Sequence, residues 1–159
     1  MSSLDVAQRI TRFLVEFGIP CSAGVARGST FLPGVWIEAG GVRWDPQVLA
    51  WPGDLLHEAG HLATLPPSMR KAQSGTLVVT PADEMAAIAW SWAARARLGL
   101  EPGLLFHSGG YKGGSESLLA SFATRQPVGV PLLAWYGMTT VEQFPVMTTW
   151  LRPHEAPTE

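Results

Sequence analysis

Residues 54–63, which read DLLHEAGHLA, decide the fold that we expect for this chain. Apolar residues recur in this stretch at the three- and four-residue spacing of a helix that turns one face to the protein core. Pro52 stands just ahead of it, where proline favours the first turn of a helix, and Pro66 marks its end. Residues four apart lie one above the other on a helix, so the side chains of His57 and His61 are expected to point to the same side.

His57, Glu58 and His61 together form the pattern HExxH. Two imidazoles on one helical face can bind the same zinc ion, and a carboxylate beside the first ligand can accept a proton from water activated there. Zinc lowers the pKa of a bound water to roughly 7, which makes hydroxide available at neutral pH. The motif therefore predicts a catalytic zinc ion bound by the two histidines, with Glu58 as general base in the hydrolysis of a peptide or amide bond.

A catalytic zinc ion usually has three protein ligands, so one more must come from outside the motif. The extended pattern HExxHxxGxxH is absent, because Thr64 and Pro67 occupy the positions of its glycine and last histidine. The side chains that remain as candidates are Glu84, Asp83, His107 and His154. Two histidines and a carboxylate suit zinc better than other divalent metals.

Local sequence separates the two neighbouring carboxylates. Residues 80–83, Thr-Pro-Ala-Asp, are typical of a helix start in which Thr80 is the N-cap and Asp83 completes a capping box, a structural role. Glu84 instead begins a helical stripe without other charges, which continues through Ala87, Ile88 and Ser91. A carboxylate on an inward-facing stripe needs a strong partner, so we favour Glu84 as the third ligand. The alternative is an exposed carboxylate stabilised by the helix dipole.

The rest of the chain predicts a helix-rich α+β fold. Helices are expected over residues 4–17, 81–98, 115–125, 131–136 and 140–151. The runs 35–38 and 42–45 flank a glycine turn and predict a hairpin packed on the motif helix, with a further strand at 76–80. Residues 21–34 and 101–114 predict loops. We expect one domain over residues 1–159, with its core at 35–98, a C-terminal helical part at 99–151 and a frayed tail at 152–159.

Composition limits the classes of partner. The 159 residues are 47% hydrophobic and 15% charged, which allows a sizeable core and argues against a disordered chain. The formal net charge is -2 and the 11 Lys and Arg form no stripe, so we expect no nucleic-acid partner. Cys21 is the one cysteine, and no stretch is typical of a signal peptide or a membrane span. These features predict a cytoplasmic protein that does not bind membranes.

The glycine-rich segment 107–114, which reads HSGGYKGG, holds two further candidates. His107 or Tyr111 can donate a hydrogen bond to the oxyanion that forms in amide hydrolysis. The alternative is a surface turn without a chemical role. No Lys-Ser or Lys-Thr closes the segment, so the sequence does not predict a phosphate-binding loop.

Residues 35–94 resemble the ImmA/IrrE-type metallopeptidase-like family, within the wider zincins that combine HExxH with a downstream glutamate. The resemblance rests on the order of a hairpin, the HExGH helix and a helix with the pattern E-x-x-A-x-x-aromatic, here Glu84 to Trp90. It implies a zincin-like fold, His57, His61 and Glu84 as metal ligands, and Glu58 as catalytic base. It also implies action in the cytoplasm on a protein or peptide substrate, often a regulator.

Two functions of different classes are compatible with these residues. The first is a zinc-dependent peptidase or amidase. The second is a non-catalytic, metal-stabilised module that senses or binds a protein partner on the same scaffold. Glu58 favours the first, because a purely structural site has no use for a base beside its ligand. A structural zinc ion is also more often bound by four Cys or His ligands, which this chain does not readily supply.

Overall fold

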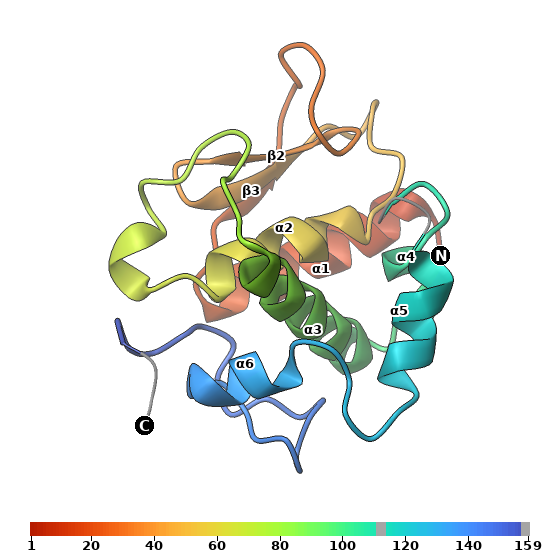
Figure 1. Ribbon diagram of the computed structural model, residues 1–159. Coiled ribbons are helices and arrows are strands. Elements are labelled where there is room, and N and C mark those ends of the chain that lie inside the picture. The colour runs from red at the N-terminus through yellow and green to blue at the C-terminus, as the bar shows by residue number, and fades with distance from the viewer. Residues whose placement is uncertain (111–113, 157–159) are drawn as a thin grey trace.

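A small mixed sheet lies on one side of the molecule and most of the helices lie on the other (Figure 1). The computed structural model describes residues 1–110 and 114–156, which contain six α-helices, one 3-10 helix and three strands. The strands are β1 (Cys21–Ala23), β2 (Val35–Glu38) and β3 (Gly41–Trp44), in the order β1-β3-β2. The helices are α1 (Ser3–Phe17), α2 (Asp54–Ala63), η1 (Pro67–Met69), α3 (Pro81–Leu98), α4 (Pro102–Leu105), α5 (Ser115–Phe122) and α6 (Val130–Trp135). This arrangement confirms the α+β class.

The predicted hairpin is confirmed, and it supplies two of the three strands. β2 pairs antiparallel with β3, so that Val35 lies opposite Trp44 and Ile37 opposite Val42. These four side chains are buried, because alternate residues of a strand point to the same face. The turn between the strands places Ala39 and Gly40 at positive φ, 49° and 75°. The hairpin thereby turns one apolar face toward α2.

The prediction of a loop over residues 21–34 is wrong at its beginning. Cys21–Ala23 forms β1, which pairs parallel with β3. Three residues of mixed polarity carry no strand pattern of their own, so the strand depends on its pairing with β3, whose partner residues lie 21 positions further along the chain. The strand makes β3 the centre of the sheet and leaves β2 as an edge.

Three further expectations about local structure are wrong. Residues 76–80 form no strand, since the Val78 side chain is fully exposed and the backbone bonds to the hairpin come from the residues before them: Gly75 N donates to Ile37 O and Gln73 O accepts from Gly40 N (both 2.9 Å). Residues 140–151 form turns rather than a helix, because Pro145 in their middle has no N–H to donate. The expected loop 101–114 begins with the short helix α4.

The predicted frayed tail at residues 152–159 is wrong at its beginning, because Arg152 is bonded to the end of α2 and Glu155 to η1, whereas residues 157–159 lie outside the described residues. The backbone N–H of Arg152 donates to Ala63 O (2.9 Å), and its guanidinium donates to Thr64 O (3.2 Å). The guanidinium also lies 4.1 Å from the ring centre of Tyr136. Glu155 accepts bonds from the N–H and hydroxyl of Ser68 (both 2.8 Å). Arginine suits this place, because the last carbonyls of a helix lack partners and carry negative partial charge.

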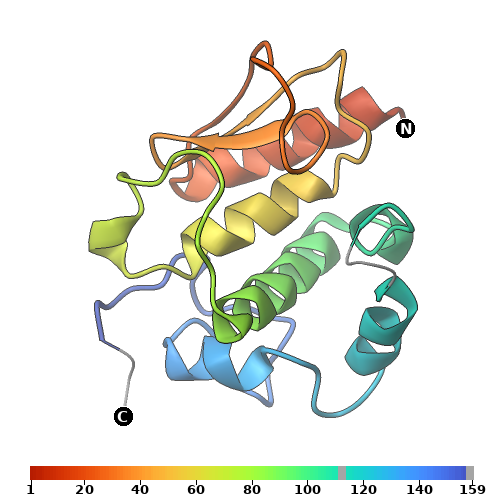
Figure 2. The same ribbon diagram turned by 45° about the horizontal axis from the view of Figure 1, so that its top comes forward.

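Helix α2 lies between the sheet and α3 (Figure 2). Every residue of α2 is buried except Glu58, which is partly exposed. A Cβ at Gly60 would lie 2.7 Å from the carbonyl oxygen of Ala87, so glycine permits the close approach of α2 and α3. No helix in residues 1–110 and 114–156 is both long enough and apolar enough to cross a membrane.

Candidate metal centre

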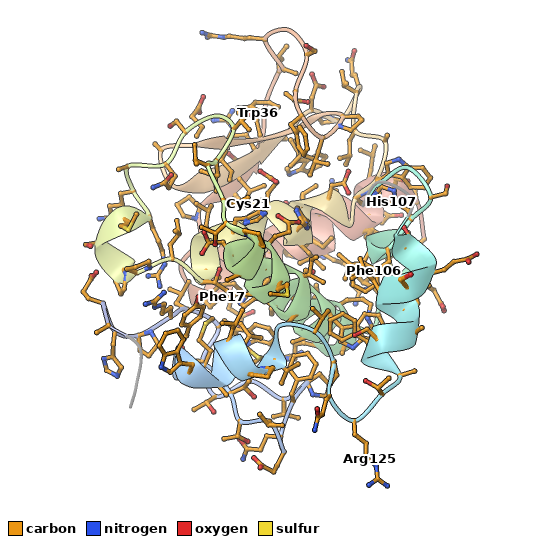
Figure 3. All side chains as sticks on the ribbon, viewed as in Figure 1. Phe17, Cys21, Trp36, Phe106, His107 and Arg125 are labelled. Carbon is orange, nitrogen blue, oxygen red and sulfur yellow. The ribbon has the colours of Figure 1, made fainter. Side chains whose placement is uncertain are left out.

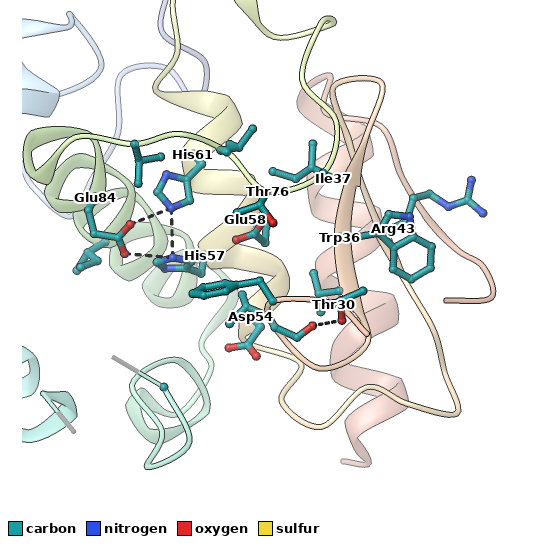
Figure 4. A pocket seen from close by; sticks show the side chains of 18 of the residues that line it. Thr30, Trp36, Ile37, Arg43, Asp54, His57, Glu58, His61, Thr76 and Glu84 are labelled. Carbon is teal, nitrogen blue, oxygen red and sulfur yellow. Dashed lines mark hydrogen bonds and ion pairs between the residues drawn. The ribbon is translucent and has the colours of Figure 1, made fainter. Parts of the chain in front are cut away.

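The two predicted histidines and Glu84 meet where α2 passes α3 (Figure 4). His57 Nε2 lies 3.2 Å from Glu84 Oε1, and His61 Nε2 lies 3.1 Å from Glu84 Oε2. The two Nε2 atoms are 3.2 Å apart. The histidines are buried, whereas the side chain of Glu84 is 37% exposed at the opening. Two helices that are not adjacent in the sequence thus bring three potential ligands to one point.

Local packing explains why Glu84 reaches the histidines. Gly60 lies between His57 and His61 on α2 and contacts the backbone of Ala87, one turn after Glu84. The capping box predicted for Thr80 and Asp83 is confirmed, because Thr80 N donates to Asp83 Oδ2 (2.9 Å) and Asp83 N donates to Thr80 Oγ1 (3.1 Å). This box fixes the first turn of α3, so the neighbouring Glu84 is presented toward α2.

The donor atoms fit a metal ion. Zinc bonds of about 2.0–2.1 Å in a tetrahedron place the ligand atoms about 3.3 Å from one another. The separations of 3.1 to 3.2 Å among the two nitrogens and the carboxylate oxygens are close to that value. Donor atoms of His57, Glu58 and His61 also lie within 4.8 Å of one another, which is near enough for a metal site. The geometry is compatible with a divalent ion and does not identify the element.

The charges of these groups depend on one another. Burial opposes ionisation of Glu84, but hydrogen bonds with His57 and His61 outweigh it and hold the pKa of this carboxyl well below its usual range. Burial also opposes protonation of His57, but the hydrogen bond and charge of Glu84 outweigh it and raise the pKa. Burial raises the pKa of Glu58. Glu84 and His57 therefore each favour the charged form of the other.

A cleft of about 1490 Å³ opens over the cluster. His57, Glu58, His61 and Glu84 all line it. One wall comes from β2 and the segment 24–34 that precedes it, and another comes from residues 74–80 and the start of α3. Gly114, Ser117 and Leu118 add a third side. The first two walls were not predicted from the sequence, because segments 24–34 and 74–80 have no periodic pattern of apolar residues. The apolar residues that stand in these loop positions are the one signal that could have indicated a cleft wall.

His107 lies apart from the three potential ligands. Its Nε2 is 2.7 Å from Asp54 Oδ1, and both side chains are buried. The ring of Trp51 stacks on the imidazole, with ring centres 4.2 Å apart (the position of His107 is labelled in Figure 3). The other polar atoms of this pair, Asp54 Oδ2 and His107 Nδ1, are buried without a hydrogen-bond partner in the part of the chain that the structure describes. His107 thus ties the segment after α4 to the first turn of α2.

The remaining candidates are placed as follows. Tyr111 lies outside the described residues. His154 is exposed near the end of the chain. Cys21 is buried and its Sγ lies 3.5 Å from Thr11 Oγ1. Comparisons with protein-family models, with curated proteins and with solved structures found no significant match to this chain.

Proposed function

We propose that this protein is a zinc-dependent peptidase or amidase with a zincin-like fold. The observation that carries the proposal is the convergence of His57 Nε2, His61 Nε2 and the Glu84 carboxylate within 3.1 to 3.2 Å. These three side chains are the proposed ligands. Glu58 lines the same cleft from the same helix, so a carboxylate that is not needed as a ligand would remain beside a bound ion.

Glu58 is the proposed general base. A bound zinc ion would supply Lewis acidity and lower the pKa of water in the cleft. Glu58 accepts a proton from the attacking water as the water oxygen bonds to the carbonyl carbon of the scissile amide. It then delivers that proton to the amide nitrogen, and the carbon–nitrogen bond breaks to give a carboxylic acid and an amine. Partial burial favours this role, because the raised pKa of Glu58 makes it a better proton acceptor than an exposed carboxylate.

The edge of the sheet supports a polypeptide as the substrate. Ile37 O is bonded to Gly75 N outside the sheet, and Val42 N, opposite Ile37, is bonded to Pro20 O on its other side. The N–H of a strand residue points the same way as its C=O, so Ile37 N–H points out of the sheet edge. Val35 and Ile37 line the cleft, and although Val35 N–H already donates to Leu32 O, the Ile37 N–H can donate to the backbone of an extended peptide.

The test compares wild type with Glu58→Gln, which keeps the shape of the side chain and removes the base. Both proteins are expected to bind about one zinc per chain that a chelator removes, as measured by elemental analysis. Hydrolysis of a peptide library by the variant is expected to fall by about 10²–10⁴-fold. Unchanged cleavage by Glu58→Gln would rule out this base. Zinc binding without cleavage by wild type would favour the second function, a metal-stabilised module that binds a protein partner.

A further inference from the structure

Large apolar side chains stand exposed on both walls of the cleft. Val25 and Phe31, from the segment between β1 and β2, are 80% and 79% exposed. Val79, from the segment before α3, is 39% exposed, and Leu77 beside it is partly buried. All four line the same cleft. Figure 4 shows Thr30 and Thr76, one residue from each segment, at this opening. Exposed apolar groups that gather around one opening mark a binding surface rather than chance exposure.

Charge is concentrated at the floor of the cleft and is sparse on its walls. Asp54, Glu58 and Glu84 lie at the floor with the two histidines. On the described walls, Arg43 and Glu38 form an ion pair of 3.2 Å, so their charges cancel. Arg27 is the remaining charged residue that lines these walls. A bound divalent ion would neutralise part of the negative charge of the carboxylates at the floor. The walls therefore complement an occupant that is apolar and carries little charge.

We propose that the cleft selects an extended segment of polypeptide with apolar, uncharged side chains, which contact Phe31 and Val25 on one wall and Leu77 and Val79 on the other. Ile37 lines the same cleft, and its N–H, which points out of the sheet edge, fits a polypeptide backbone better than a lipid chain, which has no amide groups. This inference names the substrate class of the proposed peptidase and rests on that function for its biological meaning. Its test uses binding alone, so the two can fail separately.

The experiment uses full-length Glu58→Gln protein loaded with zinc, so that no probe is consumed. Two fluorescein-labelled peptides of equal length and no net charge serve as probes, one rich in Leu, Phe and Val and the other with Ser and Gln at those positions. Fluorescence anisotropy gives each dissociation constant. We expect the apolar peptide to bind about tenfold more tightly, and Phe31→Ser to weaken its binding by about tenfold, as expected when one large apolar contact is lost.

Two further variants make the result specific. Val25→Ser is a second change on the same wall and is also expected to weaken binding of the apolar peptide. Val146→Ser is the matched control, because Val146 is 69% exposed but does not line the cleft, and it should leave binding unchanged. All the positions are exposed, so the variants are expected to fold, which circular dichroism checks.

Several results would overturn the inference. Equal affinity for the two peptides, or equal losses in Phe31→Ser and Val146→Ser, would show that the walls do not select apolar chains. A dimer of the wild type that Phe31→Ser dissociates in sedimentation would assign the surface to a second copy. Binding to neutral phosphatidylcholine vesicles in place of the peptide would assign it to lipid. Selective binding without cleavage by wild type would instead leave this inference standing and count against the proposed peptidase.

Discussion

Glu84 and Asp83 are adjacent carboxylates in the first turn of α3, and replacing each by alanine should have opposite consequences. Asp83 makes two bonds with Thr80 and none to the histidines, whereas Glu84 contacts both histidines. We expect Glu84→Ala to weaken zinc binding by at least about 100-fold, since loss of even an outer-shell partner typically costs 10–100-fold. Asp83→Ala should leave zinc affinity unchanged and lower the free energy of unfolding by about 0.5–2 kcal/mol, as for a lost cap.

The size of the effect follows from mass action. A ligand present at about 100 times its dissociation constant stabilises the folded protein by about 2.7 kcal/mol. For a domain of this size, that stabilisation raises the midpoint of thermal unfolding by about 5–11 °C. At the same zinc concentration, a 100-fold loss of affinity leaves about 0.4 kcal/mol, or about 1–2 °C. The rise in the unfolding midpoint when zinc is added (the increment), rather than the midpoint itself, therefore shows whether the replaced side chain is a zinc ligand.

The assay is thermal unfolding by circular dichroism, with zinc and with a chelator, for wild type and both variants. We expect the increment to persist in Asp83→Ala at a lower midpoint and to disappear nearly completely in Glu84→Ala. The reasoning would be refuted by the reverse pattern, in which Asp83→Ala loses the increment and Glu84→Ala keeps it. Calorimetric titration with zinc gives the affinities directly and checks the assumed 100-fold difference.

Three further predictions concern packing, two beside the site and one at Cys21 in β1. Gly60→Ala should destabilise the fold by about 1–3 kcal/mol in urea unfolding, because its Cβ would meet the Ala87 carbonyl at 2.7 Å; no loss of stability would contradict the packing of α2 on α3. His107→Leu leaves the buried carboxylate of Asp54 without its partner and should cost about 3–5 kcal/mol, whereas His107→Gln, which retains a donor, should cost clearly less; equal losses would speak against the pair. Burial raises the pKa of the Cys21 thiol from its usual 9.0 to about 11, so its alkylation at pH 8 should be much slower than in the unfolded protein and should accelerate as pH rises toward 11. Between these pKa values the folded thiol retains a proton that the unfolded one has lost, so this group's contribution to stability falls as pH rises; fast alkylation of the folded protein at pH 8 would contradict its burial.

Features governed by neighbouring residues could be predicted from the sequence. Helices α2 and α3 were expected because caps, prolines and apolar spacing act within a few positions, and the capping box of Thr80 and Asp83 has the expected bonds. The hairpin β2–β3 followed from a glycine turn between two short apolar runs. Glu84 was favoured over Asp83 because the capping role of Asp83 left Glu84 without a local partner. That reasoning placed three potential ligands on two helices, and the structure brings them together.

Features that depend on distant residues could not be predicted in this way. β1 forms because it pairs with β3, whereas the three residues of β1 show no strand pattern of their own. The contact of His107 with Asp54 joins positions 53 residues apart, so no local signal distinguished it from a turn at the surface. The apolar walls of the cleft lie in irregular segments, where spacing does not indicate which side chains share a face. The residue types near position 152 likewise did not indicate that the Arg152 side chain is buried.

The attachment of Arg152 to the end of α2 has a consequence for the order of events during synthesis. Ribosomes release the chain from its N-terminus onward, so α2 and α3 emerge before residues 150–155. Until then, Ala63 O and Thr64 O lack the donors that Arg152 supplies in the finished structure. The end of the helix that carries His61 is therefore expected to be less stable until Arg152 is in place, and a zinc ion bound earlier would be held by an incomplete scaffold. Stable metal binding is therefore expected only after this late segment has emerged and packed against the end of α2.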